Sequence, residues 1–393
     1  ARSYPTITMD VLASPANAHG FGQRYDLPLP LYLYLYGTAA VVVATFVLVA
    51  LFVRRTGRTT RRPRLDLLDY APGKIIAQPG VILVLKLLAV GLFAVTVAAG
   101  FIGNQNPYLN IAPTMVWIIV WVGFAYVSAF LGDFWTLINP WRTIFDGVAW
   151  MYRRVDIGSE FSCRLPYPAA FRIWPAVALL LMFSWIELVY PTPAVPAHIA
   201  CFAVGYSVLT WAGMILFGRD AWIRHGEVFS VFFGTFARFA PTEARTDPPP
   251  ELILRPFGAG LLDNRSTSLS TTAFVLMLLS TVLYDGLLNT PEWTLLESAI
   301  GAIFRTPGEF ELIAVRSAGL LAFWLLFLGA YTLIAAMMSA DAGGSRSPCE
   351  IAQRFAFTLI PIAIGYHLAH YLAFLLVQGQ YIIPLISDPF GWG

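Results

Sequence analysis

Long runs of apolar residues recur along the chain, separated by shorter polar segments. A helix needs about 20 mostly apolar residues to cross a hydrocarbon core about 30 Å thick. Eight runs meet this requirement, at roughly 30–53, 80–102, 113–138, 169–190, 198–217, 268–289, 317–338 and 355–377. Barrel strands would show alternation instead, and only helices or closed barrels satisfy the backbone in lipid. The pattern therefore predicts an all-α, polytopic integral membrane bundle of about eight transmembrane helices.

The composition narrows the class further. Of 393 residues, 58% are hydrophobic and 12% are charged, about half the charged share of a soluble protein. An ordinary soluble enzyme is excluded, and the lipid bilayer is the expected partner. A net charge of +2 gives no reason to expect nucleic acid, and the absence of a Gly-rich phosphate loop argues against a nucleotide. The three cysteines are too far apart for a disulfide framework.

The basic residues predict the orientation of the spans. If the loop after the first span is inside, nineteen of the 25 Lys and Arg residues lie in inside loops and three lie outside. Cytoplasmic loops carry such an excess. We therefore expect a multi-pass protein of the bacterial inner (plasma) membrane with both termini in the periplasm.

The domain organisation follows from these spans. Residues 1–28 read as an external tail, and residues 29–393 as a single transmembrane domain. Amphipathic segments near 140–152, 226–238 and 292–304 predict interfacial helices. Small residues at Ala16 and Ala18 resemble a cleavage site. Whether the tail is processed at Ala18, or follows a signal peptide removed before Ala1, stays open.

Four ionisable residues are predicted at similar depth in the outer half of the membrane. Glu187 and Asp285 close two outward-running spans, and His367 and His370 share one face of the last span. Ionisable groups in lipid cost about 2.5–3.5 kcal/mol at mid-span, so each is a functional candidate.

Two histidines and two carboxylates match the ligands of one divalent transition metal, zinc or iron. Such a metal would activate water for hydrolysis, with His19 or Asp26 of the tail capping the site. The alternative is a polar cluster satisfied by backbone, buried water and Arg316. Haem is not expected, because its paired histidines normally come from two facing helices.

A second polar cluster is predicted at the cytoplasmic end, with Asp133, Arg142 and Arg219. Asp133 could pair with either arginine or with Lys86. The cluster could be a structural lock at the surface, or it could belong to a substrate or proton path.

Three segments resemble a family of bacterial integral membrane proteins labelled fenitrothion hydrolase. They are Ala18-His19-Gly20-Phe21-Gly22-Gln23-Arg24-Tyr25-Asp26-Leu27-Pro28, Gly132-Asp133-Phe134-Trp135 with Asn139-Pro140-Trp141, and Tyr366-His367-Leu368-Ala369-His370-Tyr371. The resemblance implies hydrolysis of an organophosphorus ester, and it carries no assigned active-site residue.

Three functions remain open on the sequence. The first is a metal-dependent ester hydrolase acting at the outer face. The second is an accessory subunit of a respiratory or photosynthetic complex, contacting other membrane subunits, lipids, pigments or quinones through its many aromatic residues. The third is a secondary transporter. The buried charges favour it, whereas the lack of a visible internal repeat and the clustering of polar groups at the two surfaces disfavour it.

Overall fold

The computed structural model describes residues 36, 39–40, 43, 65–155, 160–245, 251–262, 267–303 and 308–393. The tail with Ala18, His19 and Asp26, and nearly all of the predicted first span at 30–53, lie outside these residues. The predictions made for these residues stay predictions.

Six helical segments of the described chain are long and apolar enough to cross a membrane. They are α3 (Pro79–Ile102), the rod Ile111–Phe130, α9 (Pro196–Phe217), α12 (Leu269–Leu288), α14 (Glu309–Asp341) and the segment Pro348–Ser387. The predicted span at 169–190 contains α8 (Trp174–Leu188), which is apolar but shorter. The all-α membrane bundle is thus confirmed.

Two of these segments are composite. The rod Ile111–Phe130 consists of α4 (Ile111–Pro113), the π-helical η3 (Thr114–Gly123) and α5 (Phe124–Phe130). The segment Pro348–Ser387 consists of α15 (Pro348–Phe355), η5 (Ala356–Leu359), α16 (Ile360–Gln378), η6 (Gly379–Tyr381) and α17 (Ile382–Ser387). η3 carries Trp117 and Trp121.

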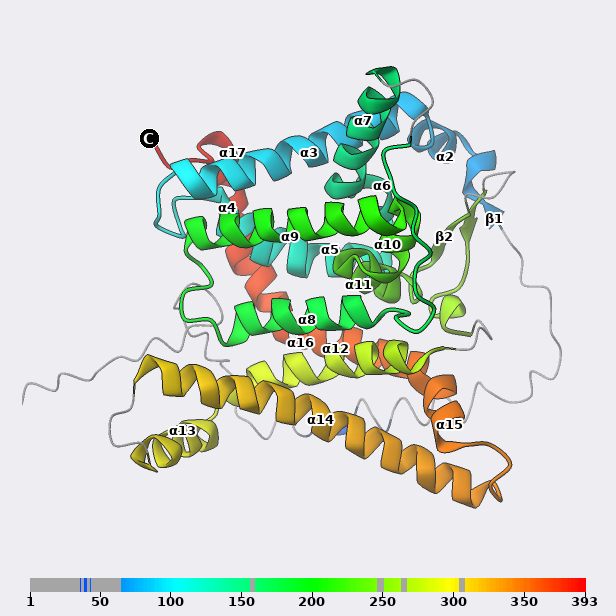
Figure 1. Ribbon diagram of the computed structural model, residues 1–393, viewed down its shortest axis with the longest axis vertical. Coiled ribbons are helices and arrows are strands. Elements are labelled where there is room, and N and C mark those ends of the chain that lie inside the picture. The colour runs from blue at the N-terminus through cyan, green and yellow to red at the C-terminus, as the bar shows by residue number, and fades with distance from the viewer. Residues whose placement is uncertain are drawn as a thin grey trace, which may run out of the picture.

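The long helices form a layered bundle with α12 at its centre. Figure 1 shows α3, α9, α8, α12 and α14 following one another from the top of the view to the bottom. α12 packs against α8, α14 and α16. In its apolar stretch 78% of the residues are buried, compared with 6% in that of α3 and 11% in that of α14. α12 therefore forms the core, while α3 and α14 present most of their surface to the surroundings.

Shorter elements connect the long helices. They are η2 (Leu67–Asp69), α2 (Ala71–Ile76), α6 (Phe134–Ile138), α7 (Pro140–Val155), α10 (Arg219–His225), α11 (Val228–Ala237), η4 (Ala259–Leu262) and α13 (Pro291–Ile303). A three-stranded antiparallel sheet has the order β1 (Leu65–Asp66), β3 (Glu251–Leu254), β2 (Thr242–Arg245). Leu254 of the central strand β3 pairs with Leu65 of β1 on one side and with Thr242 of β2 on the other. The sheet joins the segment before α3 to the segment after α11.

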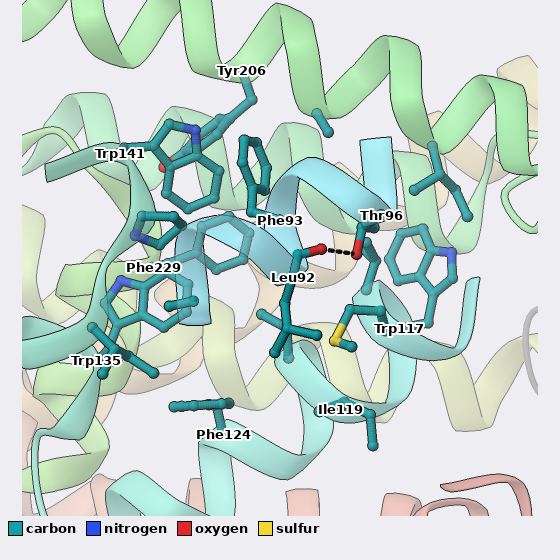
Figure 2. Close-up of a pocket in the computed structure, with 18 of the residues that line it drawn as sticks. Leu92, Phe93, Thr96, Trp117, Ile119, Phe124, Trp135, Trp141, Tyr206 and Phe229 are labelled. Atoms are coloured by element: carbon teal, nitrogen blue, oxygen red, sulfur yellow. Dashed lines mark hydrogen bonds between the residues drawn. The ribbon is translucent and has the colours of Figure 1, made fainter. Parts of the chain in front are cut away.

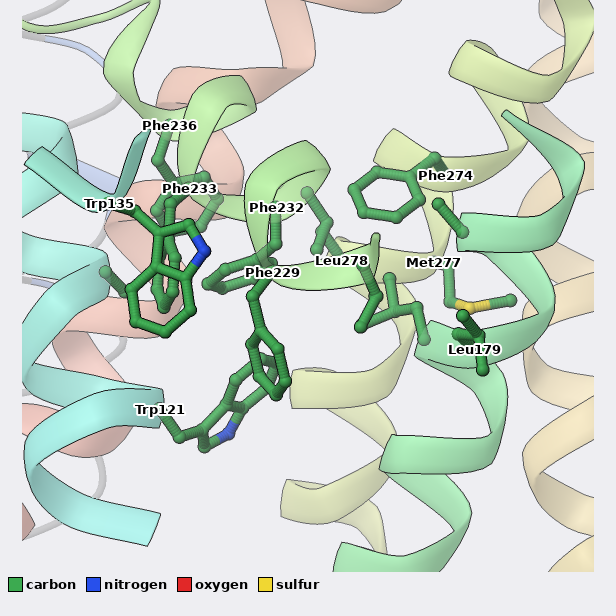
Figure 3. Packing of buried hydrophobic residues seen from close by; sticks show 14 of the residues in the cluster. Trp121, Trp135, Leu179, Phe229, Phe232, Phe233, Phe236, Phe274, Met277 and Leu278 are labelled. Carbon is green, nitrogen blue, oxygen red and sulfur yellow. The ribbon is translucent and has the colours of Figure 1, made fainter. Parts of the chain in front are cut away.

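The segment predicted as an interfacial helix at 226–238 forms α11, which lies inside the bundle. Phe232, Phe233 and Phe236 are at most 1% exposed, and α11 packs against α5, α8 and α16. Figure 3 shows these rings between Trp121 and Trp135 on one side and Phe274 on the other. The Trp121 and Phe232 rings stack with centroids 4.6 Å apart. Close packing of large aromatic groups gives this region a single arrangement.

Candidate functional site

A histidine and an aspartate from different helices meet in the bundle core. His370 Nε2 on α16 lies 2.6 Å from Asp285 Oδ2 on α12. The Asp285 side chain is fully buried, whereas 24% of the His370 side chain is exposed. Burying a charged carboxylate is costly unless it is paired and hydrogen-bonded. His370 supplies that pairing, and a proton can pass between the two groups.

A second carboxylate lies beside this pair. Glu187 of α8 is 8% exposed, and its Oε1 accepts hydrogen bonds from the Tyr371 hydroxyl at 3.0 Å and from the Trp121 indole at 3.1 Å. Tyr371 follows His370 directly, and the centroids of their rings are 4.7 Å apart. α16 therefore carries, on consecutive residues, the groups that contact the acids of α12 and α8.

His367 lies one turn earlier on α16 in an aromatic enclosure. It is 2% exposed, and neither ring nitrogen has a hydrogen-bond partner among the described residues. The rings of Tyr371, Tyr126 and Phe236 surround it, with centroids 4.7, 5.5 and 5.7 Å away. Most buried polar groups are hydrogen-bonded, so an imidazole left unsatisfied calls for an explanation.

The structure brings together part of the predicted metal site. His370 and Asp285 are in contact, while Glu187 is bound by Tyr371 and Trp121 and His367 by aromatic rings. Within the described part of the chain, no three His, Cys, Asp or Glu side chains gather closely enough to hold a metal ion. The metal role of these residues stays a prediction. Arg316, proposed as an alternative partner, instead binds Glu297 at 2.9 Å.

Glu227 is a buried acid that the sequence reasoning missed. It is fully buried at the start of α11, where it accepts hydrogen bonds from the backbone N–H groups of Phe229 at 3.1 Å and Ser230 at 2.8 Å. The Asn139 amide at 3.0 Å and the Tyr206 hydroxyl also donate to it. The available signal was an acidic residue directly before an apolar helical run, which is the position of an N-cap.

An apolar cavity of about 530 Å³ lies between α3 and the rest of the bundle. Figure 2 shows its wall, which includes Phe93, Trp117, Phe124, Trp135, Trp141, Tyr206 and Phe229. The hydroxyl of Thr96 turns away to the Leu92 carbonyl oxygen at 2.7 Å, which leaves the wall almost without polar groups. Such a surface suits a hydrocarbon chain rather than a polar ligand.

The cluster of Asp133, Arg142 and Arg219 is arranged differently from the predicted pairing. Arg219 binds Asp146 at 2.6 Å and Asp220 at 2.9 Å, and Arg142 Nη2 lies 4.0 Å from Asp220. The hydrogen bonds from the Arg219 guanidinium hold the pKa of the Asp220 carboxyl below its ordinary value. Asp133 instead caps α6, where its side chain accepts from the backbone N–H and the hydroxyl of Thr136. Asp146 and Asp220 thus take the place that Asp133 was expected to hold.

No protein-family model, curated protein or solved structure matches this chain. The resemblance to the fenitrothion hydrolase family accordingly stays a prediction. The fold and the site define the class of the molecule: a multi-span helical membrane protein in which a buried carboxyl, that of Asp285, is paired with a histidine in the core.

Proposed function

We propose that this chain is a proton-coupled secondary transporter of the bacterial inner membrane, and that the His370–Asp285 pair takes up and releases the coupling proton. The observation that carries the proposal is the 2.6 Å contact between two titratable side chains from different helices of the core. Ionisable groups inside membrane proteins mark ion pathways and proton relays.

The coupling follows from the charge of the pair. With a proton on the imidazole the pair is neutral, and without it a single negative charge remains in a low-dielectric core. That charge raises the free energy of the conformation in which Asp285 is fully buried. Deprotonation therefore favours any conformation that gives the carboxylate access to water or to a cation.

Glu187 extends the effect to a third helix. Its partners Trp121 and Tyr371 are neutral donors, and Tyr371 is next to His370 on α16. A proton that moves at the pair changes the electric field at Glu187. The polar contacts of α8, α12 and α16 are thus linked at one level of the bundle.

We place this level in the outer half of the membrane. Glu187 and Asp285 lie within the last turn of α8 and α12, and both helices begin at the arginine-rich end that contains α10. The excess of basic residues puts that end in the cytoplasm. The proton would enter from the periplasm, on the side where the carboxyl terminus is also expected.

Proteoliposomes enclosing a pH-sensitive dye test the proposal. We expect at least one solute from a panel of sugars, amino acids and anions to drive proton movement through the wild type. Asp285→Asn should abolish proton movement and keep solute exchange, and His198→Asn, outside the pair, should change neither. If Asp285→Asn retains coupled proton movement, or if no solute moves protons through the wild type, the proposal is wrong.

The same pair also fits an ester hydrolase, the first of the sequence hypotheses. A buried Asp285 that orients a partly exposed His370 is the arrangement of a general base. Hydrolysis of a nitrophenyl phosphate ester that is lost in His370→Asn would favour this function. If the purified protein holds about one metal ion per chain and the double variant His367→Ala/His370→Ala loses it, the hydrolase would be metal-dependent. Subunits that co-purify with the chain would instead favour the role of an accessory subunit.

A further inference from the structure

A polar cavity of about 1100 Å³ opens at the arginine-rich end of the bundle, where α8 and α12 begin and where α10 and α11 lie. It is separate from the apolar cavity behind α3, because α6 lies between them: Trp135 and Ile138 face the apolar cavity, and Asp133 and Thr136 face the polar one. The charged residues that line it are Arg142, Arg172, Arg219, Arg224, Arg238, Asp133 and Asp220, and His225 is also in the wall.

The acids in this wall do not balance the arginines. Asp220 is already bound by Arg219, which also holds Asp146. Arg224 donates from Nε to the backbone carbonyl oxygen of Asp220 at 3.1 Å, and neither it nor Arg172 forms an ion pair with any described residue. Guanidinium groups that line a cavity without matching carboxylates create a strongly positive potential.

Arg142 adds a partly exposed guanidinium group to the wall. Its Nε lies 4.0 Å from Asp146 and its Nη2 lies 4.0 Å from Asp220, and both distances are too long for a hydrogen bond. Because 28% of the side chain is exposed and the residue lines the cavity, an anion in the cavity can contact this guanidinium.

Asp133 is the other acid of the wall. Its carboxylate accepts hydrogen bonds from the backbone N–H and the hydroxyl of Thr136, so it caps α6 rather than pairing with an arginine.

Arg172 is held in place by contacts within the wall of the cavity. Its φ of 43° lies in the left-handed region, where a non-glycine residue is uncommon and costs free energy. The Tyr167 hydroxyl donates to the Arg172 carbonyl oxygen at 2.9 Å, and the Tyr167 ring stacks on His225 at 5.0 Å. All three residues line the cavity. Contacts within the wall thus hold Arg172 in a strained conformation at the cavity.

We propose that this cavity binds the phosphate group of an organic phosphate, with Arg142, Arg172 and Arg224 as the cationic contacts. Arginine matches phosphate oxygens with paired N–H donors, and hydroxyl groups such as that of Ser230 add neutral donors. The cavity is far larger than a phosphate ion, and Ile173, Ile223 and Val231 in its wall can hold an organic group. The phosphate can belong to a soluble ester or to a phospholipid headgroup.

This inference does not rest on proton coupling, although it supplies a class of solute for the proposed transporter. The test measures binding only. Wild-type protein in an uncharged detergent is titrated with inorganic phosphate and glycerol 3-phosphate, and it is also reconstituted in phosphatidylcholine nanodiscs with and without phosphatidylglycerol. Arg172→Gln and Arg224→Gln are compared with Arg164→Gln, which is at the same end of the bundle, also has a positive φ, and lies outside the cavity.

We expect saturable binding that weakens at higher salt concentration, with a Kd raised about tenfold or more in Arg172→Gln and Arg224→Gln and changed less than about twofold in Arg164→Gln. Glycerol 3-phosphate binding in detergent would identify a soluble ester. Retention of phosphatidylglycerol, lost in the two cavity variants, would identify a headgroup.

The inference is overturned if the wild type binds neither the two soluble probes nor the anionic lipid. It is also overturned if Arg164→Gln weakens binding as much as the cavity variants, because the effect would then be one of net charge alone. Because no proton movement is measured, a negative result in this binding test leaves the His370–Asp285 proposal unaffected. A failure of the proton-transport test likewise leaves the phosphate-binding proposal unaffected.

Discussion

His370 Nε2 and Asp285 Oδ2 are 2.6 Å apart although 85 positions separate the two residues in the chain. The contact joins α16 to α12, the most buried of the spanning helices. It places the partly exposed imidazole of His370 against the fully buried carboxyl of Asp285, so the protonation of the pair and the packing of the two helices depend on each other. The proposed proton coupling is a consequence of this dependence.

Removing one member of the pair should destabilise the bundle. Asp285→Ala leaves the partly exposed imidazole without its partner, and losing a hydrogen bond to a charged group costs about 1.5–3 kcal/mol. Asp285→Asn keeps a hydrogen-bond acceptor and should cost less. Thermal unfolding in detergent measures the stabilities of the wild type, Asp285→Asn and Asp285→Ala, which we expect to decrease in that order. His198→Asn is the control outside the pair. Equal stability of Asp285→Ala and wild type would show that the pair contributes nothing to folding.

Glu227 predicts a structural effect at the centre of the bundle. Glu227→Ala removes the acceptor of Asn139, Tyr206 and two backbone N–H groups of α11. A lost N-cap costs about 1 kcal/mol, and each buried donor left unsatisfied about 1–3 kcal/mol, so we expect a loss of several kcal/mol. Glu292→Ala, at the start of α13, should have little effect. Comparable melting temperatures for the two variants would contradict the role assigned to Glu227.

Trp222 allows a matched pair of glycine substitutions on α9. A Cβ atom at Gly213 would overlap the Trp222 indole, whereas a Cβ at Gly205 on the same helix meets nothing within 4 Å. Gly213→Ala should therefore destabilise the protein, and Gly205→Ala should stabilise it by up to about 1 kcal/mol through helix propensity. Unfolding curves of the two variants check this. A neutral Gly213→Ala would mean that α9 and α10 are not packed as described.

The Arg219–Asp220 contact predicts a pH dependence at the arginine-rich end. The hydrogen bond from Arg219 lowers the pKa of Asp220 from its ordinary value of 3.8 in the folded protein. A carboxyl whose pKa is lowered by folding stabilises the folded protein at pH values above the pKa of the unfolded state. This contribution is lost as the pH falls below 3.8 and through the pKa of the folded state. The stability difference between wild type and Asp220→Asn should thus be constant near neutral pH and vanish in acid. A difference that grows on acidification would have the wrong sign.

Apolar runs predicted the spanning helices well, because helix length in a membrane is set by its thickness. The apolar runs could not predict that the segment after Glu227 enters the core as α11. Its ten residues are too few to cross a membrane, so the pattern predicted a helix at the membrane surface. The depth of polar residues was also informative: Glu187, Asp285, His367 and His370 do lie on neighbouring helices. Depth does not specify rotation about the helix axis, however.

Rotation decides which groups meet, and side-chain packing sets it. For this reason the sequence left open whether Glu187 would contact a histidine, and the structure pairs it with Trp121 and Tyr371. The same limit explains Asp133, whose carboxylate caps α6 locally rather than reaching an arginine across the bundle. Short-range capping competes with distant ion pairs, and periodicity in the sequence does not rank the two.

The central claim, that the His370–Asp285 pair binds and releases a proton, is tested most directly by nitrogen-15 NMR of His370 in lipid bilayers as a function of pH. The imidazole nitrogens report the protonation state of that one ring. The account predicts that the ring-nitrogen signals of the wild type depend on pH, because the pair takes up and releases a proton, and that Asp285→Asn changes this dependence, because it removes the carboxylate that contacts Nε2. Signals that do not change with pH, or that change identically in Asp285→Asn, would contradict the account.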